Sequence, residues 1–263
     1  MKKSLISKAA NNIFKYRMNN KILNSISKDC IPQTEKEAYL IQKYLHKLFD
    51  LKYLDNVSAI KIGCTTSTMQ NYLNIPNPCA GKIRSNNCYK SGLKLFYKNY
   101  IKPGVECELA VRLSSDINSQ KELSDKALYE CLDNIYAAIE IVDDRYKDWS
   151  KLSSKMLIAD DFFSSGCVLG DSVLLKSIKD INNIKGVMYV NGISVGEGVG
   201  GDILGHPLNA LRWLIGRKDI IGEYLPSGTI VLLGSLVKTK WLKKGDEVKI
   251  KISNIGESKV KFI

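Results

Sequence analysis

Histidine is scarce in this chain of 263 residues, which contains only His46 and His206. A metal site built from several histidines is therefore excluded. The seven cysteines are scattered, odd in number and free of any Cys-x-x-Cys pair, which argues against both a zinc site and a disulfide framework. Unpaired thiols are typical of a reducing compartment, so we expect a cytoplasmic protein.

Long apolar runs are also missing. No stretch approaches the roughly 20 apolar residues that a membrane-spanning helix needs. The first residues resemble the start of a signal peptide, but Lys8 and Asn11 interrupt the apolar run too early. We therefore expect neither a membrane partner nor export.

Blocks of basic residues are absent as well, although the formal net charge is +12. The lysines are dispersed, and along Val248–Ile252 they alternate with apolar residues, as on a strand with one face in water. A solvated, lysine-rich surface explains this pattern better than nucleic-acid binding does. The positive field would still attract small anionic substrates.

Two helices are predicted before the first strand. Residues 4–27 carry apolar residues at four-residue spacing, which is typical of an amphipathic helix. Thr34 and Glu37 form a capping-box pattern that opens a second helix. His46 lies off the apolar stripe of this second helix, so we expect it at the surface.

Mostly strands follow these helices. Val57–Gly63 is predicted as a strand, residues 74–88 as a loop rich in proline, glycine and asparagine, and Asn191-Gly192 as a type I′ hairpin turn. Helices first and strands later indicate an α+β fold. We expect a small N-terminal helical region with a short strand over 1–75 and a rolled, mostly antiparallel mixed β domain over 76–263.

The centre of the chain is a strand predicted over Gly104–Leu113. Side chains alternate faces along a strand, so Glu106 and Glu108 project together from the face opposite the apolar residues. Taken alone, this pair fits the wet face of a half-exposed strand. Glu140 lies inside the apolar run Ala137–Val142, however, and a buried carboxylate is costly unless it is paired. Three converging carboxylates would suit a hard cation such as Mg²⁺ or Mn²⁺.

Other polar residues each allow two interpretations. Lys61 has apolar neighbours in its strand and either extends to water, the common case, or is held in a site suited to acid–base work. Asp160 and Asp161 are either solvated turn formers or groups within reach of the metal. His206 precedes Pro207 at a predicted helix start, and a structural role is favoured.

Short motifs in a fixed order extend from about Ala38 to Phe262. They are Ala38-Tyr39-x-x-Gln42, Lys61-Ile62-Gly63, Gly104-x-Glu106-x-Glu108, Ala138-Ile139-Glu140-Ile141-Val142-Asp143, Ile158-Ala159-Asp160, Val168-Leu169-Gly170, Leu204-Gly205-His206-Pro207 and Gly234-Ser235-Leu236. Through these motifs the chain resembles the family of 2-keto-4-pentenoate hydratases and 4-oxalocrotonate decarboxylases, within the fumarylacetoacetate-hydrolase fold superfamily.

The resemblance implies a β-roll of fumarylacetoacetate-hydrolase type and a divalent metal, Mg²⁺ or Mn²⁺, held by Glu106, Glu108 and Glu140. It implies that Lys61 binds or protonates a 2-oxo acid and makes Asp160 a second catalytic candidate. The substrate-binding candidates that go with this resemblance are Lys61, Leu109, Ser165 and Ser235.

The chain departs from the family pattern at three places. Ser85-Asn86-Asn87 stands where relatives usually carry an acidic residue, Leu233 where they carry Thr or Ser, and Asp161 where they carry Asn. The first two changes remove a candidate proton carrier and a substrate-contacting hydroxyl. The predicted metal ligands are intact.

The resemblance further implies a metal-dependent lyase of aromatic catabolism that acts on a small anionic 2-oxo or 2-hydroxydienoic acid. Hydration of a 2-hydroxypenta-2,4-dienoate-like substrate is the preferred hypothesis. The alternatives are decarboxylation of a 2-oxo-enedioate, C–C hydrolysis of an acylpyruvate, and a non-catalytic subunit that supports a partner enzyme. A homo-oligomer is expected, and a complex with a related pathway enzyme is a further option.

Overall fold

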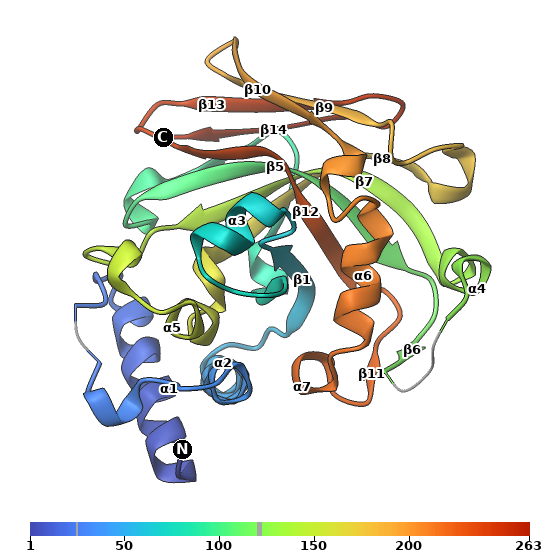
Figure 1. The fold of residues 1–263 in the computed structure, drawn as a ribbon. Coiled ribbons are helices and arrows are strands. Elements are labelled where there is room, and N and C mark those ends of the chain that lie inside the picture. The colour runs from blue at the N-terminus through green and yellow to red at the C-terminus, as the bar shows by residue number, and fades with distance from the viewer. Residues whose placement is uncertain (25, 120–122) are drawn as a thin grey trace.

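Two β-sheets pack against each other, and helices surround the larger one (Figure 1). The computed structural model describes residues 1–24, 26–119 and 123–263. The strands are β1 Val57–Gly63, β2 Cys79–Arg84, β3 Cys88–Lys90, β4 Leu93–Leu95, β5 Pro103–Leu113, β6 Ile117–Asn118, β7 Leu132–Asp143, β8 Ser164–Leu174, β9 Lys185–Val190, β10 Ile193–Val199, β11 Tyr224–Leu225, β12 Ile230–Trp241, β13 Glu247–Ile252 and β14 Gly256–Phe262. The helices are α1 Lys3–Met18, α2 Glu35–Lys52, α3 Ser67–Tyr72, α4 Asp125–Glu130, α5 Ser154–Ala159, α6 Pro207–Ile215 and α7 Lys218–Ile221.

The larger sheet has seven strands in the order β2-β1-β12-β5-β7-β8-β3. Its central strands pair antiparallel, whereas β1 pairs with β12, and β3 with β8, in parallel. The smaller sheet has the order β10-β9-β13-β14-β4 and lies across the upper side of the molecule in Figure 1. This curled, mostly antiparallel arrangement confirms the predicted α+β class with a rolled β domain.

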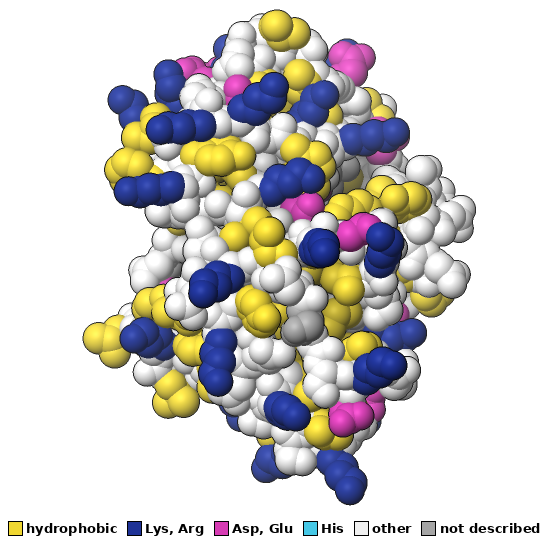
Figure 2. All heavy atoms as spheres, turned by 90° about the vertical axis from the view of Figure 1, so that its left-hand side faces the viewer, with side chains coloured by type: hydrophobic (Ala, Val, Ile, Leu, Met, Phe, Trp, Pro, Cys, Tyr) yellow, Lys and Arg dark blue, Asp and Glu magenta, His cyan; other side chains and the backbone are white. Residues whose placement is uncertain are grey.

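The distribution of basic side chains and the state of the cysteines agree with what the sequence predicted. Lysine and arginine side chains are dispersed over the face shown in Figure 2 rather than gathered in one patch. All seven cysteines are free thiols. Within the described ranges, no helix is both long and apolar enough to cross a membrane.

The N-terminal helix is shorter than predicted. The helix expected over 4–27 ends at Met18, and residue 25 of that range lies outside the described residues. Asn20 follows with a left-handed backbone, φ 47°, which a continuing helix does not allow. Ile22, which continues the four-residue spacing beyond Met18, is exposed, so this spacing does not mark a buried helix face and that part of the prediction was wrong.

The segment 74–88 is only partly a loop, because β2 forms within it and pairs antiparallel with β1. Gly81 explains the error. A side chain at Gly81 would place its Cβ 2.2 Å from the backbone oxygen of Asp161, so this glycine marks a close approach of two backbones within a strand. The domain boundary expected after residue 75 stays a prediction, and β1 from the first region pairs with β12 from the second.

Two local predictions are confirmed. Asn191 and Gly192, with φ values of 52° and 81°, connect β9 to β10 as the type I′ turn requires. His206 caps α6, since its Nδ1 accepts the backbone N–H of Leu208 at 3.2 Å. The short-range sequence signal determines both features.

A left-handed turn follows α5. Asp161, Phe162 and Phe163 all have positive φ, at 58°, 49° and 65°, which costs about 1–2 kcal/mol per non-glycine residue. The buried Asp161 carboxylate makes contacts that offset this backbone strain. Arg17 Nη1 lies 2.7 Å from its Oδ2, and His46 Nε2 lies 2.9 Å from both of its oxygens. Helices α1 and α2 thus hold this turn in place.

His46 is buried, so its predicted surface location was wrong. The stripe of α2 indicates only which residues face the main core, whereas the other side of α2 is covered by α1 and by the Asp161 turn. Burial lowers the pKa of His46 despite the nearby Asp161 carboxylate, so the imidazole is neutral and donates from Nε2. Burial alone would raise the pKa of Asp161, but His46 and Arg17 outweigh it and hold that pKa below its usual range.

We predict that Gly81→Ala destabilises the protein by about 1–3 kcal/mol, because the added methyl group forces β2 and the Asp161 backbone apart. Thermal and urea unfolding measure the loss. Gly201→Ala is the matched control, since its Cβ would meet only the Asn182 oxygen at 3.7 Å. Equal stability of the two variants would show that the contact relaxes without cost.

We predict that the wild type loses stability relative to His46→Gln as the pH is lowered from about 7.5 to 5.5. His46 has a folded pKa below its unfolded value of about 6.5, so the unfolded chain takes up the proton first, at a cost of up to about 1.4 kcal/mol per pH unit. The difference between the two proteins isolates this contribution from those of the other buried titratable groups, which are common to both. His206→Asn, which keeps a capping acceptor, should follow the wild type. A parallel pH dependence of the wild type and His46→Gln would contradict this prediction.

Candidate metal centre

Three carboxylates converge where β5 and β7 pair. Glu106 and Glu140 are direct cross-strand partners, and Glu108 lies two residues further along β5 on the same face. One oxygen from each of the three lies within 4.8 Å of the others. The alternation of side chains along two hydrogen-bonded strands thus produces the convergence that was predicted.

Neighbouring groups fix two of the three carboxylates. The backbone N–H of Gly234 donates to Glu108 Oε2 at 2.7 Å, and the Thr239 hydroxyl donates to Glu106. Gly234 has φ 133° and packs against Thr65, whose Oγ1 would lie 2.4 Å from an added Cβ. Only glycine therefore fits here.

Lys61 is buried beside this cluster rather than extended to water. Its Nζ lies 3.0 Å from Glu140 Oε1, an ion pair whose geometry falls short of a hydrogen bond. The ammonium also lies 4.9 Å from the centre of the Phe162 ring. Burial alone would lower the pKa of Lys61, but the carboxylates of Glu140 and Glu106 outweigh it and raise that pKa above its usual range.

The cluster has more negative charge than its protein neighbours balance. Burial raises the pKa of Glu140 to about 7, and burial together with the other two carboxylates raises the pKa of Glu108. Among the described residues, Glu108 Oε1 and both Glu140 oxygens have no hydrogen-bond partner. With all three glutamates ionised and Lys61 charged, two negative charges are uncompensated. This set of hard oxygen ligands fits a divalent cation such as Mg²⁺ or Mn²⁺.

Asp160 lies in a different set of contacts. Its buried carboxylate accepts from Arg145 Nε at 3.1 Å and from the Tyr146 hydroxyl at 2.9 Å, and Arg17 Nη1 lies 3.5 Å away. These contacts connect α1, the end of β7 and the turn that carries Phe162. The catalytic assignment of Asp160 stays a prediction.

The other substrate-binding candidates differ in their surroundings. Leu109 is fully buried in the main core on the face opposite the glutamates, so only its backbone could face the site. The Ser235 hydroxyl donates to the backbone oxygen of Val237 at 2.6 Å, at an irregular part of β12. Leu233 is also fully buried. The roles of Leu109 and Ser235 therefore stay predictions.

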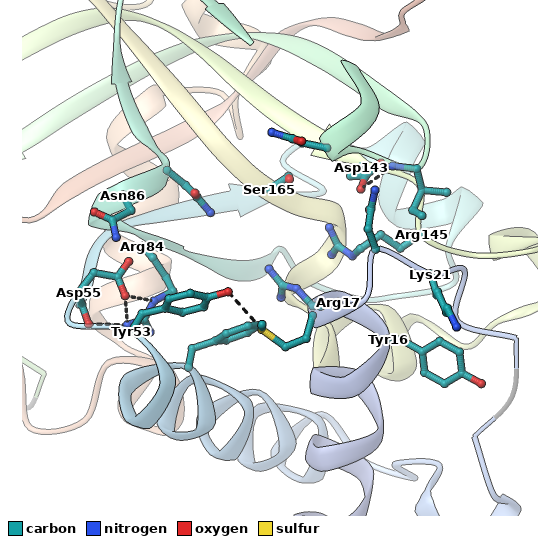
Figure 3. Close-up of a pocket in the computed structure, with 16 residues that line it drawn as sticks. Tyr16, Arg17, Lys21, Tyr53, Asp55, Arg84, Asn86, Asp143, Arg145 and Ser165 are labelled. Carbon is teal, nitrogen blue, oxygen red and sulfur yellow. Dashed lines mark hydrogen bonds and ion pairs between the residues drawn. The ribbon is translucent and has the colours of Figure 1, made fainter. Parts of the chain in front are cut away.

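Ser165 lines a cavity of about 340 Å³ at the end of the β7–β8 pair (Figure 3). Sequence reasoning did not find this cavity, because its walls come from distant segments. Its lining includes Arg17, Lys21, Asp55, Arg84, Asn86, Asn87, Asp143, Arg145 and Ser165. The only local signal was a charged run, Asp143 to Arg145, directly after an apolar strand.

Comparison with known proteins places the chain in one family. The family model described as fumarylacetoacetate (FAA) hydrolase C-terminal matches residues 94–263. The chain is 31% identical over 226 residues to a 2-keto-4-pentenoate hydratase from Burkholderia vietnamiensis, over 86% of this chain and 85% of that protein. It is 26% identical over 247 residues to a 2-oxo-hept-4-ene-1,7-dioate hydratase from Escherichia coli, over 92% of this chain and 91% of that protein.

Solved structures agree with this family. A 4-oxalocrotonate decarboxylase from Pseudomonas putida G7, complexed with magnesium and adipate, has a TM-score of 0.92 at 21% identity and covers 100% of this chain and 99% of that chain. The shared fold therefore extends beyond the segment that the family model matches. The chain belongs to the fumarylacetoacetate hydrolase family, among the relatives of the 2-keto-4-pentenoate hydratases.

Proposed function

We propose that this protein is a divalent-metal-dependent lyase of small 2-oxo or 2-hydroxydienoic acids, and that it hydrates a 2-hydroxypenta-2,4-dienoate-like substrate. The cluster of Glu106, Glu108 and Glu140, two of them buried, with Lys61 as the one cation beside it, carries this proposal. The hydratases among its relatives support the reaction class and the substrate class. The intact cluster argues against a non-catalytic subunit.

Glu106, Glu108 and Glu140 would hold Mg²⁺ or Mn²⁺, which when bound supplies Lewis-acid stabilisation of negative charge on the 2-oxo oxygen. The three carboxylates need little rearrangement, because the β5–β7 ladder, Gly234 and Thr239 already position them. Such preorganisation lowers the cost of stabilising charge as it develops.

Lys61 would bind the anionic end of the substrate and hold a proton at Nζ for transfer to carbon. Its neighbours Glu140 and Phe162 restrict where the ammonium can lie. Because Lys61 is buried, water competes little for this ammonium, which strengthens its attraction for a substrate anion.

Decarboxylation of a 2-oxo-enedioate is the second candidate function. A 4-oxalocrotonate decarboxylase from Pseudomonas putida is 22% identical over 242 residues, 92% of this chain. Hydration and decarboxylation both develop negative charge on the 2-oxo oxygen, so the same glutamates and Lys61 would serve either reaction. The proposal also includes a homo-oligomer, a complex with a related pathway enzyme as an option, and a cytoplasmic location, with which the seven free thiols are consistent.

We predict that Mg²⁺ raises the melting temperature of the wild type and that Glu108→Gln removes this response. Without metal, Glu108→Gln should be as stable as the wild type or more stable, because it deletes a buried charge while keeping an acceptor for Gly234. Thermal unfolding and calorimetric titration with Mg²⁺ test both points. Glu197→Gln, exposed on β10, is the control and should respond like the wild type. Equal Mg²⁺ binding by wild type and Glu108→Gln would contradict the site.

We predict that Lys61→Met lowers kcat for 2-hydroxypenta-2,4-dienoate by about 10²–10⁴-fold in the presence of Mg²⁺, while the melting temperature changes by only a few degrees. The loss of the ultraviolet absorbance of the dienoate measures turnover. Lys82→Met makes the same chemical change one strand away, at the position paired with Ile60, and should retain activity. If Lys61→Met instead loses stability and activity in proportion, Lys61 is structural.

A further inference from the structure

Two cysteines lie in the same cross-strand row as two of the glutamates. Glu106 on β5 is the partner of Glu140 on β7. Glu140 is in turn the partner of Cys167 on β8, and Cys167 is the partner of Cys88 on β3. Residues that are paired in this way point their side chains to the same face of a sheet. The row therefore continues from two carboxylates to two neighbouring thiols.

The register of β3 and β8 brings Cys88 and Cys167 close enough for a disulfide. Directly paired residues on neighbouring strands have Cα atoms about 4.8 Å apart, and disulfides join Cα atoms that are about 4.4–6.8 Å apart. Cys88 begins β3, a strand of three residues at the edge of the larger sheet. Because this edge strand is so short, the small shift that closes an S–S bond would disturb few hydrogen bonds.

The two thiols differ in their access to solvent and in their reactivity. Cys167 is fully buried, whereas Cys88 is partly exposed. Hydrogen bonds from the Cys167 thiol and from the Ser58 hydroxyl, which lies 3.2 Å from the Cys88 sulfur, lower the pKa of Cys88 although burial opposes them. The thiolate is the nucleophilic form of cysteine. Cys88 is therefore the thiol that a small oxidant reaches and that reacts first.

A second pair of neighbouring thiols has the opposite properties. Cys79 on β2 is the partner of Gly63, and Cys64 directly follows Gly63. Both cysteines are buried, and burial raises the pKa of Cys79 well above its usual value. A buried thiol with a raised pKa is inert toward oxidants. This pair is therefore an internal control for the first one.

We propose that Cys88 and Cys167 form a peroxide-reactive dithiol site, whose oxidised form is a disulfide between β3 and β8. The Cys88 thiolate attacks one oxygen of hydrogen peroxide, the O–O bond breaks and hydroxide leaves, so that Cys88 becomes a sulfenic acid. The Cys167 sulfur then attacks the Cys88 sulfur, the S–O bond breaks, and the leaving oxygen takes the Cys167 proton and departs as water. Peroxide thus gains the two electrons that the two sulfurs lose. A dithiol reductant reverses the change by attack at the partly exposed Cys88 sulfur.

Peroxide treatment of the full chain, followed by alkylation and peptide mass spectrometry, tests the site. The wild type should give a cross-linked pair of peptides that contain Cys88 and Cys167, lighter by two hydrogen atoms than the reduced pair and lost on treatment with dithiothreitol. Cys167→Ser should stop at the sulfenic acid, which dimedone traps on Cys88. Cys88→Ser should leave Cys167 unmodified, because that thiol is buried.

Cys131, which is partly exposed at the end of α4, is the reference thiol. In Cys167→Ser, dimedone should label Cys88 at least about tenfold faster than Cys131, and Cys64 and Cys79 should remain reduced at the same peroxide concentration. Cys131→Ser should keep the wild-type cross-link. Absence of the cross-link from the folded wild type, or equal labelling of Cys88 and Cys131, overturns the proposal. If either serine variant of the pair fails to fold, the wild-type cross-link and its reversal decide.

Discussion

The mutual repulsion of three carboxylates that meet at one point, two of them buried, is the constraint on which the rest of this structure depends. Glu106, Glu108 and Glu140 cannot all be ionised there unless positive charge is nearby. Lys61 supplies one positive charge. The remaining negative charge attracts a divalent cation. Without a cation the cluster therefore lowers the stability of the surrounding strands, although its oxygens are well placed to bind one.

Short-range rules predicted the parts of the site that lie on single strands. Alternation placed Glu106 and Glu108 on one face, and the apolar run around Glu140 indicated burial, because both signals need only neighbouring residues. Glu140 is fully buried, as predicted. The family resemblance implied what local physics could not, namely that the three carboxylates belong to one site. The register in which β5 and β7 pair, which brings them together, was not predicted.

Contacts between distant segments account for what sequence reasoning missed. His46 and Asp161 are 115 positions apart, and helical periodicity carries no information about such a partner. Gly81 was interpreted as a loop residue because its real neighbour, the Asp161 backbone, is equally remote in sequence. The cavity near Ser165 was missed for the same reason, since its walls combine α1, α2 and the ends of β2, β7 and β8.

The left-handed turn at Asp161–Phe163 has a consequence for the evolution of this architecture. Arg17 and His46 hold the turn, and Phe162 in that turn rests on Lys61. The segment that the family model recognises, 94–263, contains the three glutamates but neither Lys61 nor these helical anchors. The proposed site therefore extends beyond the segment that the family model matches. A gene fusion or truncation that kept only the matched segment would inherit the three glutamates without Lys61 and without the helices that hold the Asp161 turn.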